Sequence, residues 1–371
     1  MIQRLTEITP EVMDGCRNLV GYGCVRDNDE VVIIVDEETD DAVYTQALSA
    51  ASKEAGANEV YILKSKTPAN WFDDPSPFYA EAIKHADVVF CIGGYILYPQ
   101  PAGLRATSEY GTKIVRVDFR YPWMLATEFS RFPKEVLFAV VEKTVEIVSQ
   151  GKKLHIRSAQ GTDLSCGINP FAISGGHSPK CLPGDRLIFP GGMVGINPQD
   201  PVNGTLAMDF IFPTWEPPEV FLPEPLMITI EDRWASRIEG PYADWVERLL
   251  ETEGDENARW LAEIMWGNHP KAYPLGWPDV RPQDWFVPFH YRPDTLHCAL
   301  GRGIADFPPF STIHLDFYML DPVVEVDGEA IVREGRNVMY DDPEVREIAS
   351  KYGEPAEVLE VPALPTGFCI R

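Results

Sequence analysis

The first 150 residues alternate between short apolar, β-branched runs and segments whose apolar residues repeat with the period of a helix. Strands about 25 residues apart, with helices between them, form a parallel sheet covered on both faces. We therefore predict an α/β domain with a doubly wound parallel sheet over residues 1–150, with any ligand at the carboxyl ends of its strands. The predicted strands are Val31–Asp36, Val60–Leu63, Ala86–Gly94 and Thr112–Asp118, and the predicted helices are Asp41–Ala55 and Pro77–His85.

The pattern changes after a helical segment, Val136–Val148, and we place the domain boundary near Gln150-Gly151. Beyond it, alternating and apolar strands are joined by loops rich in Pro and Gly. This pattern predicts an α+β domain over residues 151–371 that is richer in antiparallel strands than the first. Leu154–Ser158 and Met227–Asp232 are its predicted strands, Pro170–Pro225 is the loop-rich stretch, and Asp244–Leu250 and Glu256–Met265 are helical by period.

Composition and charge exclude several kinds of partner. The net charge of -25 argues against nucleic acid and against an anionic membrane surface. No apolar run reaches the roughly 18 residues of a membrane span, and the N-terminus lacks the pattern of a signal peptide. No GxGxxG or Walker A motif follows the strands, so a nucleotide has little support. Seven scattered cysteines without a CxxC pair indicate reduced, mostly buried thiols and a cytoplasmic protein.

Candidate chemistry begins with the pair His314-Leu315-Asp316, which lies in an apolar run. In a strand, side chains two residues apart point to the same face, so this imidazole and this carboxylate can meet at one point. Such a pair can bind a divalent metal, or can act as a general base with its orienting partner. An isolated pair of this kind is more often structural: the histidine hydrogen-bonds to its neighbour at the end of a strand and has no catalytic role.

Three further ligand-type residues stand at the ends of predicted elements. Asp185 follows a Gly turn, Glu263 lies in the apolar helical end Trp260–Pro270, and His297 lies in a small apolar run. A charge flanked by apolar residues needs a partner if it is to stay ionised. Each residue alone has a plain structural explanation, but together with His314 and Asp316 they form a mixed set of histidines and carboxylates.

The order of these pieces resembles the thermophilic metallo-aminopeptidases (aminopeptidases T and S) and their relative 2,5-dihydroxypyridine 5,6-dioxygenase. The resemblance covers most of the chain and is stronger after residue 150. It implies an aminopeptidase T-like fold for the second domain. The matching pieces are Gly161-Thr162-Asp163-Leu164, Pro183-Gly184-Asp185, Asn203-Gly204-Thr205-Leu206, Glu263 to Ala272, His297 to Gly301 and His314-Leu315-Asp316.

The aminopeptidase resemblance implies a set of metal ligands. In this chain the matching positions are Asp185, Glu263, His297, His314 and Asp316. The tyrosine that the family carries seven residues after its first histidine is Ile304 here. The spacer between the two histidines is also short for a peptidase. Both departures disfavour peptide hydrolysis.

The dioxygenase resemblance implies one Fe(II) held by two histidines and an aspartate. His314 and Asp316 match two of these ligands, and the other histidine falls on Glu263. His297 would restore a set of two histidines and one carboxylate, which leaves open positions on Fe(II) for O2 and substrate. His269 is the reserve candidate for the same place.

Three hypotheses follow. In the first, a mononuclear non-heme Fe(II) dioxygenase opens the ring of a small hydroxylated aromatic or N-heteroaromatic compound with O2, and His155, His290 or Tyr291 moves protons. In the second, the same scaffold is a hydrolase in which Zn, Co or Mn polarises a carbonyl and activates water. In the third, it is an acidic binding protein without catalysis. We favour the dioxygenase and expect a homo-oligomer.

Overall fold

The computed structural model divides the chain into two compact units. Unit 1 comprises Met1–Lys134, His177–Gly191 and Pro278–Val280, and unit 2 comprises Glu135–Gly176, Gly192–Trp277 and Arg281–Arg371. The domain boundary near Gln150-Gly151 stays a prediction. The structure describes residues 7–36, 41–66, 73–92, 97, 100–170, 173–175, 181–212, 215–218, 220–273, 287–303 and 310–364.

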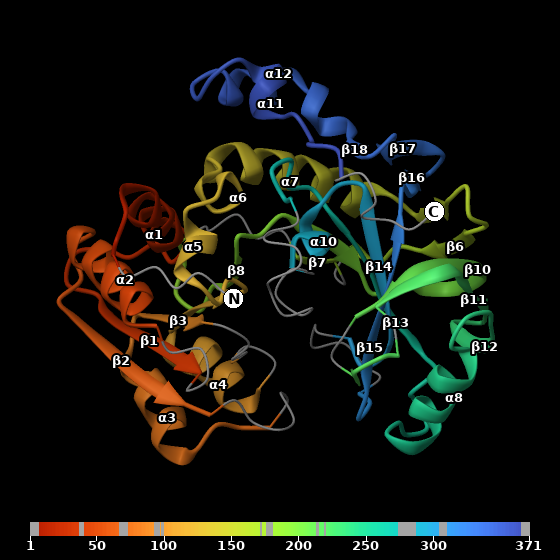
Figure 1. Cartoon of the computed structure of the whole chain (residues 1–371), viewed down its shortest axis with the longest axis horizontal. Helices are drawn as coiled ribbons and strands as arrows, with labels where there is room; N and C mark the ends of the chain where they lie inside the picture. The colour runs from red at the N-terminus through yellow and green to blue at the C-terminus, as the bar shows by residue number, and fades with distance from the viewer. Residues whose placement is uncertain are drawn as a thin grey trace. The chain divides into compact units, whose positions relative to one another are not determined.

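Unit 1 is built on a parallel sheet in the order β2-β1-β3-β4-β8 (Figure 1). The four strands predicted from the first 150 residues are β1 to β4, and all four pairings in the sheet are parallel. β8 comes from much later in the chain, because the segment 177–191 returns to this unit. The strands are β1 (Glu30–Asp36), β2 (Glu59–Ser65), β3 (Val88–Ile92), β4 (Lys113–Val117) and β8 (Arg186–Phe189).

Helices cover both faces of this sheet, as the doubly wound prediction requires. On one face, apolar residues of β1, β3 and β4 pack against η1 and α4 in one buried cluster. On the other face, Tyr22 at the end of α1 meets the ring of Phe189 at 5.0 Å. Figure 1 shows α1 and α2 on one side and α3 and α4 on the other. The helices are α1 (Pro10–Tyr22), α2 (Ala42–Glu54), α3 (Pro77–Ala82), η1 (Ile83–His85), α4 (Pro101–Tyr110), α5 (Pro122–Leu125) and α6 (Glu128–Arg131).

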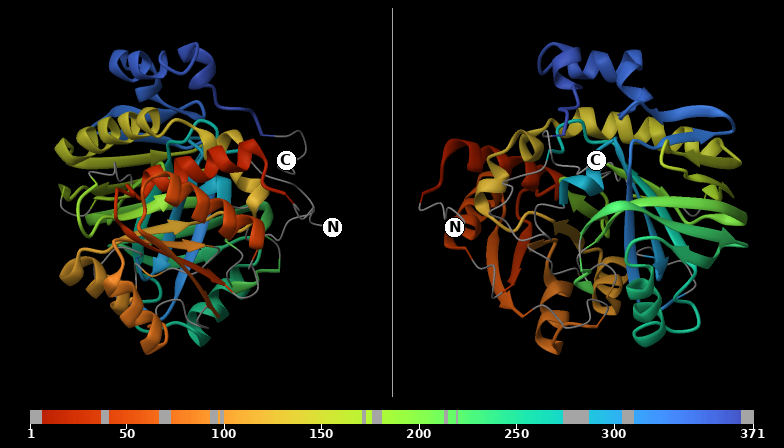
Figure 2. Two further views of the ribbon diagram at one scale, coloured as in Figure 1. Left: turned by 90° about the vertical axis from the view of Figure 1, so that its left-hand side faces the viewer. Right: turned by 45° about the vertical axis from the view of Figure 1, so that its right-hand side comes forward.

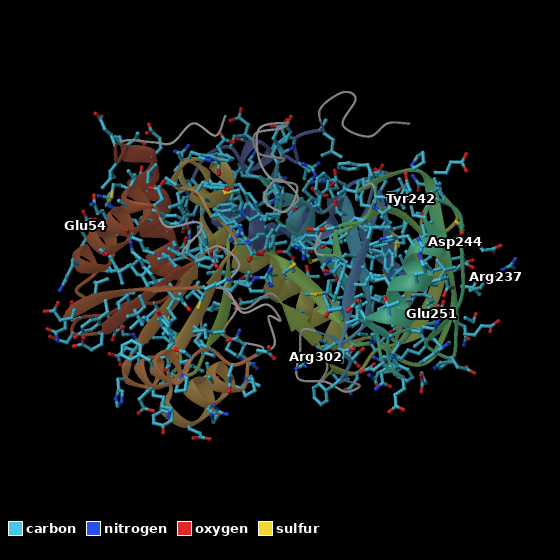
Figure 3. The ribbon with its side chains drawn as sticks, turned by 60° about the horizontal axis from the view of Figure 1, so that its bottom comes forward. Glu54, Arg237, Tyr242, Asp244, Glu251 and Arg302 are labelled. Carbon is cyan, nitrogen blue, oxygen red and sulfur yellow. A yellow bond between two sulfur atoms is a disulfide. The ribbon has the colours of Figure 1, made fainter. Side chains whose placement is uncertain are left out.

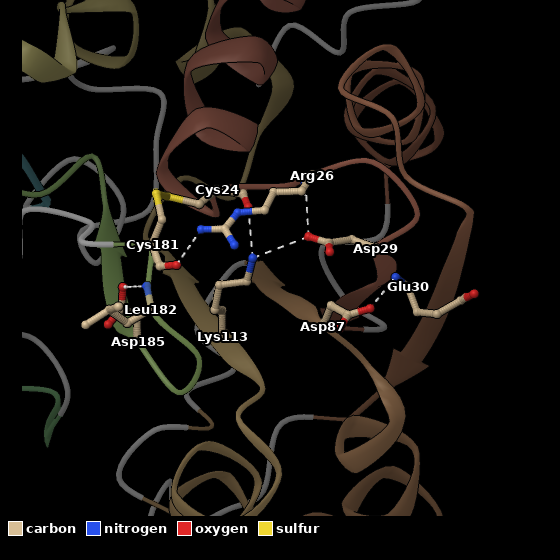
Figure 4. A network of polar contacts seen from close by, with 9 residues as sticks. All are labelled: Cys24, Arg26, Asp29, Glu30, Asp87, Lys113, Cys181, Leu182 and Asp185. Carbon is tan, nitrogen blue, oxygen red and sulfur yellow. Dashed lines mark hydrogen bonds and ion pairs between the residues drawn. A yellow bond between two sulfur atoms is a disulfide. The ribbon is translucent and has the colours of Figure 1, made fainter.

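A disulfide between Cys24 and Cys181 corrects the prediction that all thiols are reduced. It links Cys24, two residues beyond the end of α1, to the turn before β8, across a sequence separation of 157. Figure 4 shows the polar network around it: the Arg26 guanidinium donates to the Cys181 carbonyl at 2.7 Å, and Lys113 Nζ donates to the Cys24 carbonyl at 2.8 Å. The spacing of the cysteines along the chain gave no signal of this pair, because tertiary structure alone brings them together.

Unit 2 is dominated by an antiparallel sheet in the order β18-β17-β16-β5-β6-β10-β15-β14-β13-β9-β7, with β11 and β12 added beside β10. Figure 2 shows these long strands from two further sides. The antiparallel character agrees with the prediction for the second half of the chain. Its strands are β5 (Lys153–Arg157), β6 (Asp163–Gly167), β7 (Ile173–Gly175), β9 (Met193–Ile196), β10 (Gln199–Ile211), β11 (Phe221–Glu231), β12 (Trp234–Glu239), β13 (Leu261–Gly267), β14 (Thr295–Gly301), β15 (His314–Leu320), β16 (Val323–Val326), β17 (Glu329–Arg333) and β18 (Arg336–Asn337).

The helices of unit 2 lie around this sheet. α8 turns Val246 and Leu250 inward, while Asp244 and Glu251 point outward (Figure 3). Among the described residues, no helix combines the length and the apolar character that crossing a membrane requires. The helices are α7 (Lys134–Gln150), α8 (Ala243–Thr252), α10 (Val287–Tyr291), η4 (Val338–Asp341), α11 (Pro343–Ala349) and α12 (Pro355–Val358).

One predicted element has the wrong type. The segment Glu256–Met265 was expected to be helical, but residues from Leu261 onward form β13. Every residue of β13 is buried, because β14 and β9 flank it and both of its faces are covered. A strand buried on both faces loses the alternation that identifies strands, and its apolar run then resembles a helix.

Candidate metal centre

Three adjacent strands of unit 2 bring Glu263, His314 and Asp316 together. Asp316 of β15 pairs with Ala299 of β14, and Ala299 pairs in turn with Glu263 of β13. Residues opposite one another on neighbouring antiparallel strands point to the same face. His314 lies two residues before Asp316 on β15, so its side chain also points to that face. The predicted strand geometry of the His-x-Asp pair is therefore found.

These three side chains form a compact donor group. One ligand atom from each lies within 4.8 Å of the other two, and this is the group that could hold a metal among the described residues. His314 Nε2 lies 3.0 Å from Asp316 Oδ1 and 3.8 Å from Glu263 Oε1. All three side chains are buried, with at most 8% of the side chain exposed. Two carboxylates at this depth favour a cation between them.

A hydrogen-bond acceptor on the far side of the ring orients the His314 imidazole. Its Nδ1 lies within hydrogen-bonding distance of the Arg302 carbonyl, which can only accept, so Nδ1 carries the proton. In the neutral ring, Nε2 is then the nitrogen with a lone pair, and it faces the two carboxylates. The indole N–H of Trp215 donates to the His314 carbonyl at 2.9 Å and fixes the start of β15. A metal-binding histidine is oriented in this way by an acceptor on its other nitrogen.

Electrostatics couple His314 to Asp316. Burial opposes a charge on His314, but the Asp316 carboxylate outweighs this effect and raises the pKa of His314 from 6.5 to about 9. Burial likewise opposes a charge on Asp316, but the His314 imidazolium lowers the pKa of Asp316 to about 2. Without a metal, the two residues therefore form an ion pair near neutral pH, and a bound cation would replace the proton on His314.

His297 lies beside the donor group. It sits two residues before Ala299 on β14, and its Nε2 is 3.6 Å from Glu263 Oε1. Its ring contacts those of Tyr318, at 5.0 Å between centroids, and of His290, at 5.3 Å. His290, on α10, shares a hydrogen bond with the Tyr318 hydroxyl. Of the predicted site residues, the structure thus brings together Glu263, His314 and Asp316, with His297 and His290 next to them.

Other predicted residues lie elsewhere. His155 of β5 is separated from β15 by β6 and β10, and its ring nitrogens contact Asp163 at 2.7 Å and Glu325 at 3.2 Å. The reserve candidate His269 lies beyond the end of β13, and its Nδ1 accepts a hydrogen bond from the Lys271 amide at 3.2 Å. Neither histidine joins the donor group.

Asp185 and Tyr291 also have other surroundings. Asp185 belongs to unit 1, where its carboxylate accepts the Leu182 amide proton at 2.9 Å and closes the turn before β8. Its role as a metal ligand stays a prediction. Tyr291 is buried on α10, where its carbonyl accepts the His269 amide proton at 2.8 Å. Ile304, at the position of the aminopeptidase tyrosine, lies outside the described residues.

Sequence reasoning did not identify Tyr318. It continues the His-x-Asp pattern of β15 by two more residues, so the spacing alone places it on the same face. That alternation was the available signal. The Arg302 carbonyl gave no signal, because every residue has a carbonyl.

The donor group fits a divalent ion. Two oxygen or nitrogen donors about 2.1 Å from an octahedral metal are about 3.0 Å apart in neighbouring positions and about 4.2 Å apart in opposite ones. The distances of 3.0 and 3.8 Å from His314 Nε2 fall in that range. An imidazole and two carboxylates suit borderline and hard metals such as Fe, Zn and Mn.

Sequence comparison identifies the family. The profile of 2,5-dihydroxypyridine 5,6-dioxygenase (NicX) matches residues 12–280, which is more than half of the chain. The chain belongs to this family. The match includes Glu263 and ends before β14 and β15, which carry the remaining donors. No curated protein sequence matches the chain.

Two solved structures share the fold of this NicX-family chain. The 2,5-dihydroxypyridine dioxygenase from Pseudomonas putida KT2440 superposes with a TM-score of 0.70 at 19% identity, covering 90% of this chain and 98% of the other. AmpT from Thermus thermophilus superposes with a TM-score of 0.61 at 17% identity, covering 88% and 99%. Both families named from the sequence motifs are therefore confirmed as structural relatives.

Proposed function

We propose that this NicX-family protein is a mononuclear metal-dependent dioxygenase that opens the ring of a small hydroxylated N-heteroaromatic or aromatic compound. The observation that carries the proposal is the buried donor group of Glu263, His314 and Asp316, in a chain whose family is defined by 2,5-dihydroxypyridine cleavage. The family membership supports a dioxygenase, and the donor group supplies a place for its metal.

Fe(II) is the metal we propose, held by these three residues. When bound, it would supply adjacent coordination positions for O2 and for a hydroxyl oxygen of the substrate. The protein's own part is orientation. The Arg302 carbonyl keeps the proton of His314 on Nδ1, so that Nε2 faces the metal position. The low pKa of Asp316 keeps its carboxylate ionised at any pH above about 2.

Proton transfer near the centre falls to His290 in this proposal, since its ring lies 5.3 Å from that of His297 and hydrogen-bonds to Tyr318. His155 and Tyr291 were predicted for the same task. His155 is engaged by Asp163 and Glu325 on another part of the sheet, so we leave it out. Tyr291 follows His290 on α10 and stays a secondary candidate.

A metal-dependent hydrolase with Zn, Co or Mn is the second candidate, and one observation favours it. The donor group holds one imidazole and two carboxylates, whereas the usual Fe(II) set in oxygenases has two histidines and one carboxylate. In a hydrolase, such a site would polarise a carbonyl and activate water.

Metal content and oxygen consumption separate the two. Protein purified without oxygen is analysed for iron and then mixed with 2,5-dihydroxypyridine or a catechol in an oxygen electrode. Near-stoichiometric iron with oxygen uptake supports the dioxygenase. Cleavage of aminoacyl amides after zinc or cobalt addition, with no oxygen uptake, supports the hydrolase. If His314→Ala changes neither metal content nor activity, the metal site itself is wrong.

A further inference from the structure

A second row of side chains runs alongside the donor group. On β15, β14 and β13, Tyr318 pairs with His297, and His297 pairs with Met265. This row lies two residues along each strand from the row of Asp316 and Glu263, so it points to the same face of the sheet. Tyr318 and His297 are thus neighbours of the donor group by the geometry of the sheet.

The two rings of this row, His297 and Tyr318, pack against each other and against the ring of His290 on α10. The ring centroids of His297 and Tyr318 are 5.0 Å apart, and His290 lies 5.3 Å from each of them. The Tyr318 hydroxyl and His290 Nδ1 are joined by a hydrogen bond. The Phe212 ring stacks on that of His290, at 5.2 Å between centroids and an interplanar angle of 28°. The His297 ring is therefore packed against a hydrogen-bonded pair that is itself supported.

The His297 ring lies against Glu263, a member of the donor group. His297 Nε2 is 3.6 Å from Glu263 Oε1, and the two side chains are 4% and 5% exposed. His297 is not a member of the donor group. Glu263 has one more rotatable side-chain bond than an aspartate, so its carboxylate has more ways to turn away. A packed neighbour limits that freedom.

We propose that Tyr318 and His290 form a positioning pair that holds the His297 ring against Glu263, and thereby fixes the Glu263 carboxylate in the donor group. This inference rests on the proposed metal site and adds three positioning residues to it. Residues that orient metal ligands contribute about 10- to 100-fold to metal affinity, although they do not touch the metal.

The test uses ring-preserving variants of the full-length protein. Tyr318→Phe keeps the ring contacts with His297 and removes only the hydroxyl. His290→Phe keeps a ring against Phe212 and removes the ring nitrogen that hydrogen-bonds to the Tyr318 hydroxyl. The probe is Co(II), added to protein stripped of metal. Its affinity is read by competition with a chelating dye, and its visible absorption reports the coordination geometry.

We expect each variant to bind Co(II) about 10- to 100-fold more weakly than the wild type, with an altered absorption spectrum. Because the two residues act as one pair, the double variant should lose little more than either single variant. Tyr340→Phe is the matched control: it removes the hydroxyl of another buried tyrosine of unit 2, which donates to the Asn268 carbonyl at 2.9 Å. That variant should bind Co(II) like the wild type.

Unchanged affinity and spectrum in both Tyr318→Phe and His290→Phe overturn the positioning role, and so do additive losses in the double variant. Far-ultraviolet circular dichroism establishes whether each variant is folded. If either Tyr318→Phe or His290→Phe does not fold, the other single variant decides the test. A wild-type protein that binds no Co(II) overturns the proposed metal site along with this inference. If the wild-type protein binds Co(II) and the variants bind it with the same affinity, this inference alone is overturned.

Discussion

Glu263 and Asp316 stand in one row across three strands, with Ala299 of β14 between them. The two carboxylates therefore face each other over the smallest side chain that has a Cβ. Neither residue is close to the other in sequence, and the register of β13, β14 and β15 alone brings them together. The predictions below test what this arrangement does.

Glu263→Gln keeps the shape of the side chain and removes its charge. We expect metal affinity to fall by more than about 100-fold, since even residues that only orient ligands contribute 10- to 100-fold. Metal content after dialysis against a chelating resin measures the loss. Glu325→Gln is the control, because Glu325 pairs with His155 and Arg157 outside the donor group. Equal metal retention in both variants would contradict the role of Glu263.

Ala299→Leu should block the centre without removing a ligand. The added atoms would enter the space between Glu263 and Asp316, because Ala299 points to the same face as both. We expect loss of metal binding together with a destabilisation of about 1–3 kcal/mol from overpacking. Isothermal titration with metal and urea unfolding measure the two effects.

Ala349→Leu is the matched control for that substitution. Ala349 is fully buried on α11, outside the sheet that carries the donor group. It should be destabilised to a similar degree but should still bind metal. Metal binding by folded Ala299→Leu at wild-type affinity would show that the space between the carboxylates is not the metal position.

The metal-free protein should be most stable between about pH 4 and pH 6.5. The pKa of Asp316 is lowered to about 2, so its contribution is present above its unfolded value and is lost as the pH falls from 4 toward 2. The pKa of His314 is raised to about 9, so its contribution is complete below 6.5 and is lost as the pH rises toward 9. Thermal unfolding in the presence of a chelator measures both limbs. His314→Gln should flatten the alkaline limb, and an unchanged slope would contradict the pairing.

Reduction of the disulfide should destabilise unit 1. A cross-link that closes a loop of 157 residues removes entropy from the unfolded chain and stabilises the folded one by up to about 5 kcal/mol. Urea unfolding with and without a reducing agent measures the difference. The double variant Cys24→Ser/Cys181→Ser should match the reduced protein and should no longer respond to the reducing agent. A response that persists in this variant would point to another cause.

Much of the fold follows from local patterns in the sequence. β1 to β4 are short β-branched runs between helices, and β-branched residues indicate a strand even where both faces are buried, as in β1, β3 and β4. The pair His314 and Asp316 was also predictable, since alternation along one strand needs no tertiary information. The family could also be named from the sequence, because its short motifs keep their order along the chain.

The remaining features depend on contacts between distant segments. β13 was taken for a helix, because complete burial removes the alternation of a strand. The pairing of Cys24 with Cys181 and the return of β8 to the parallel sheet arise from tertiary structure. Tyr318 was within reach of the strand pattern, but its partner His290 comes from α10, which no spacing rule connects to β15.

The position of β8 has a consequence for how the chain is made. β4 is synthesised well before β8, and it pairs with β8 along its outer edge. Until Phe189 has left the ribosome, unit 1 has an unpaired strand edge, which is the kind of surface that joins with other chains. A truncated protein that ends near residue 150 would keep that edge permanently and would also lack Cys181. Unit 1 can therefore complete its sheet only after the first strands of unit 2 have been synthesised. The synthesis of the two units is interleaved along the chain.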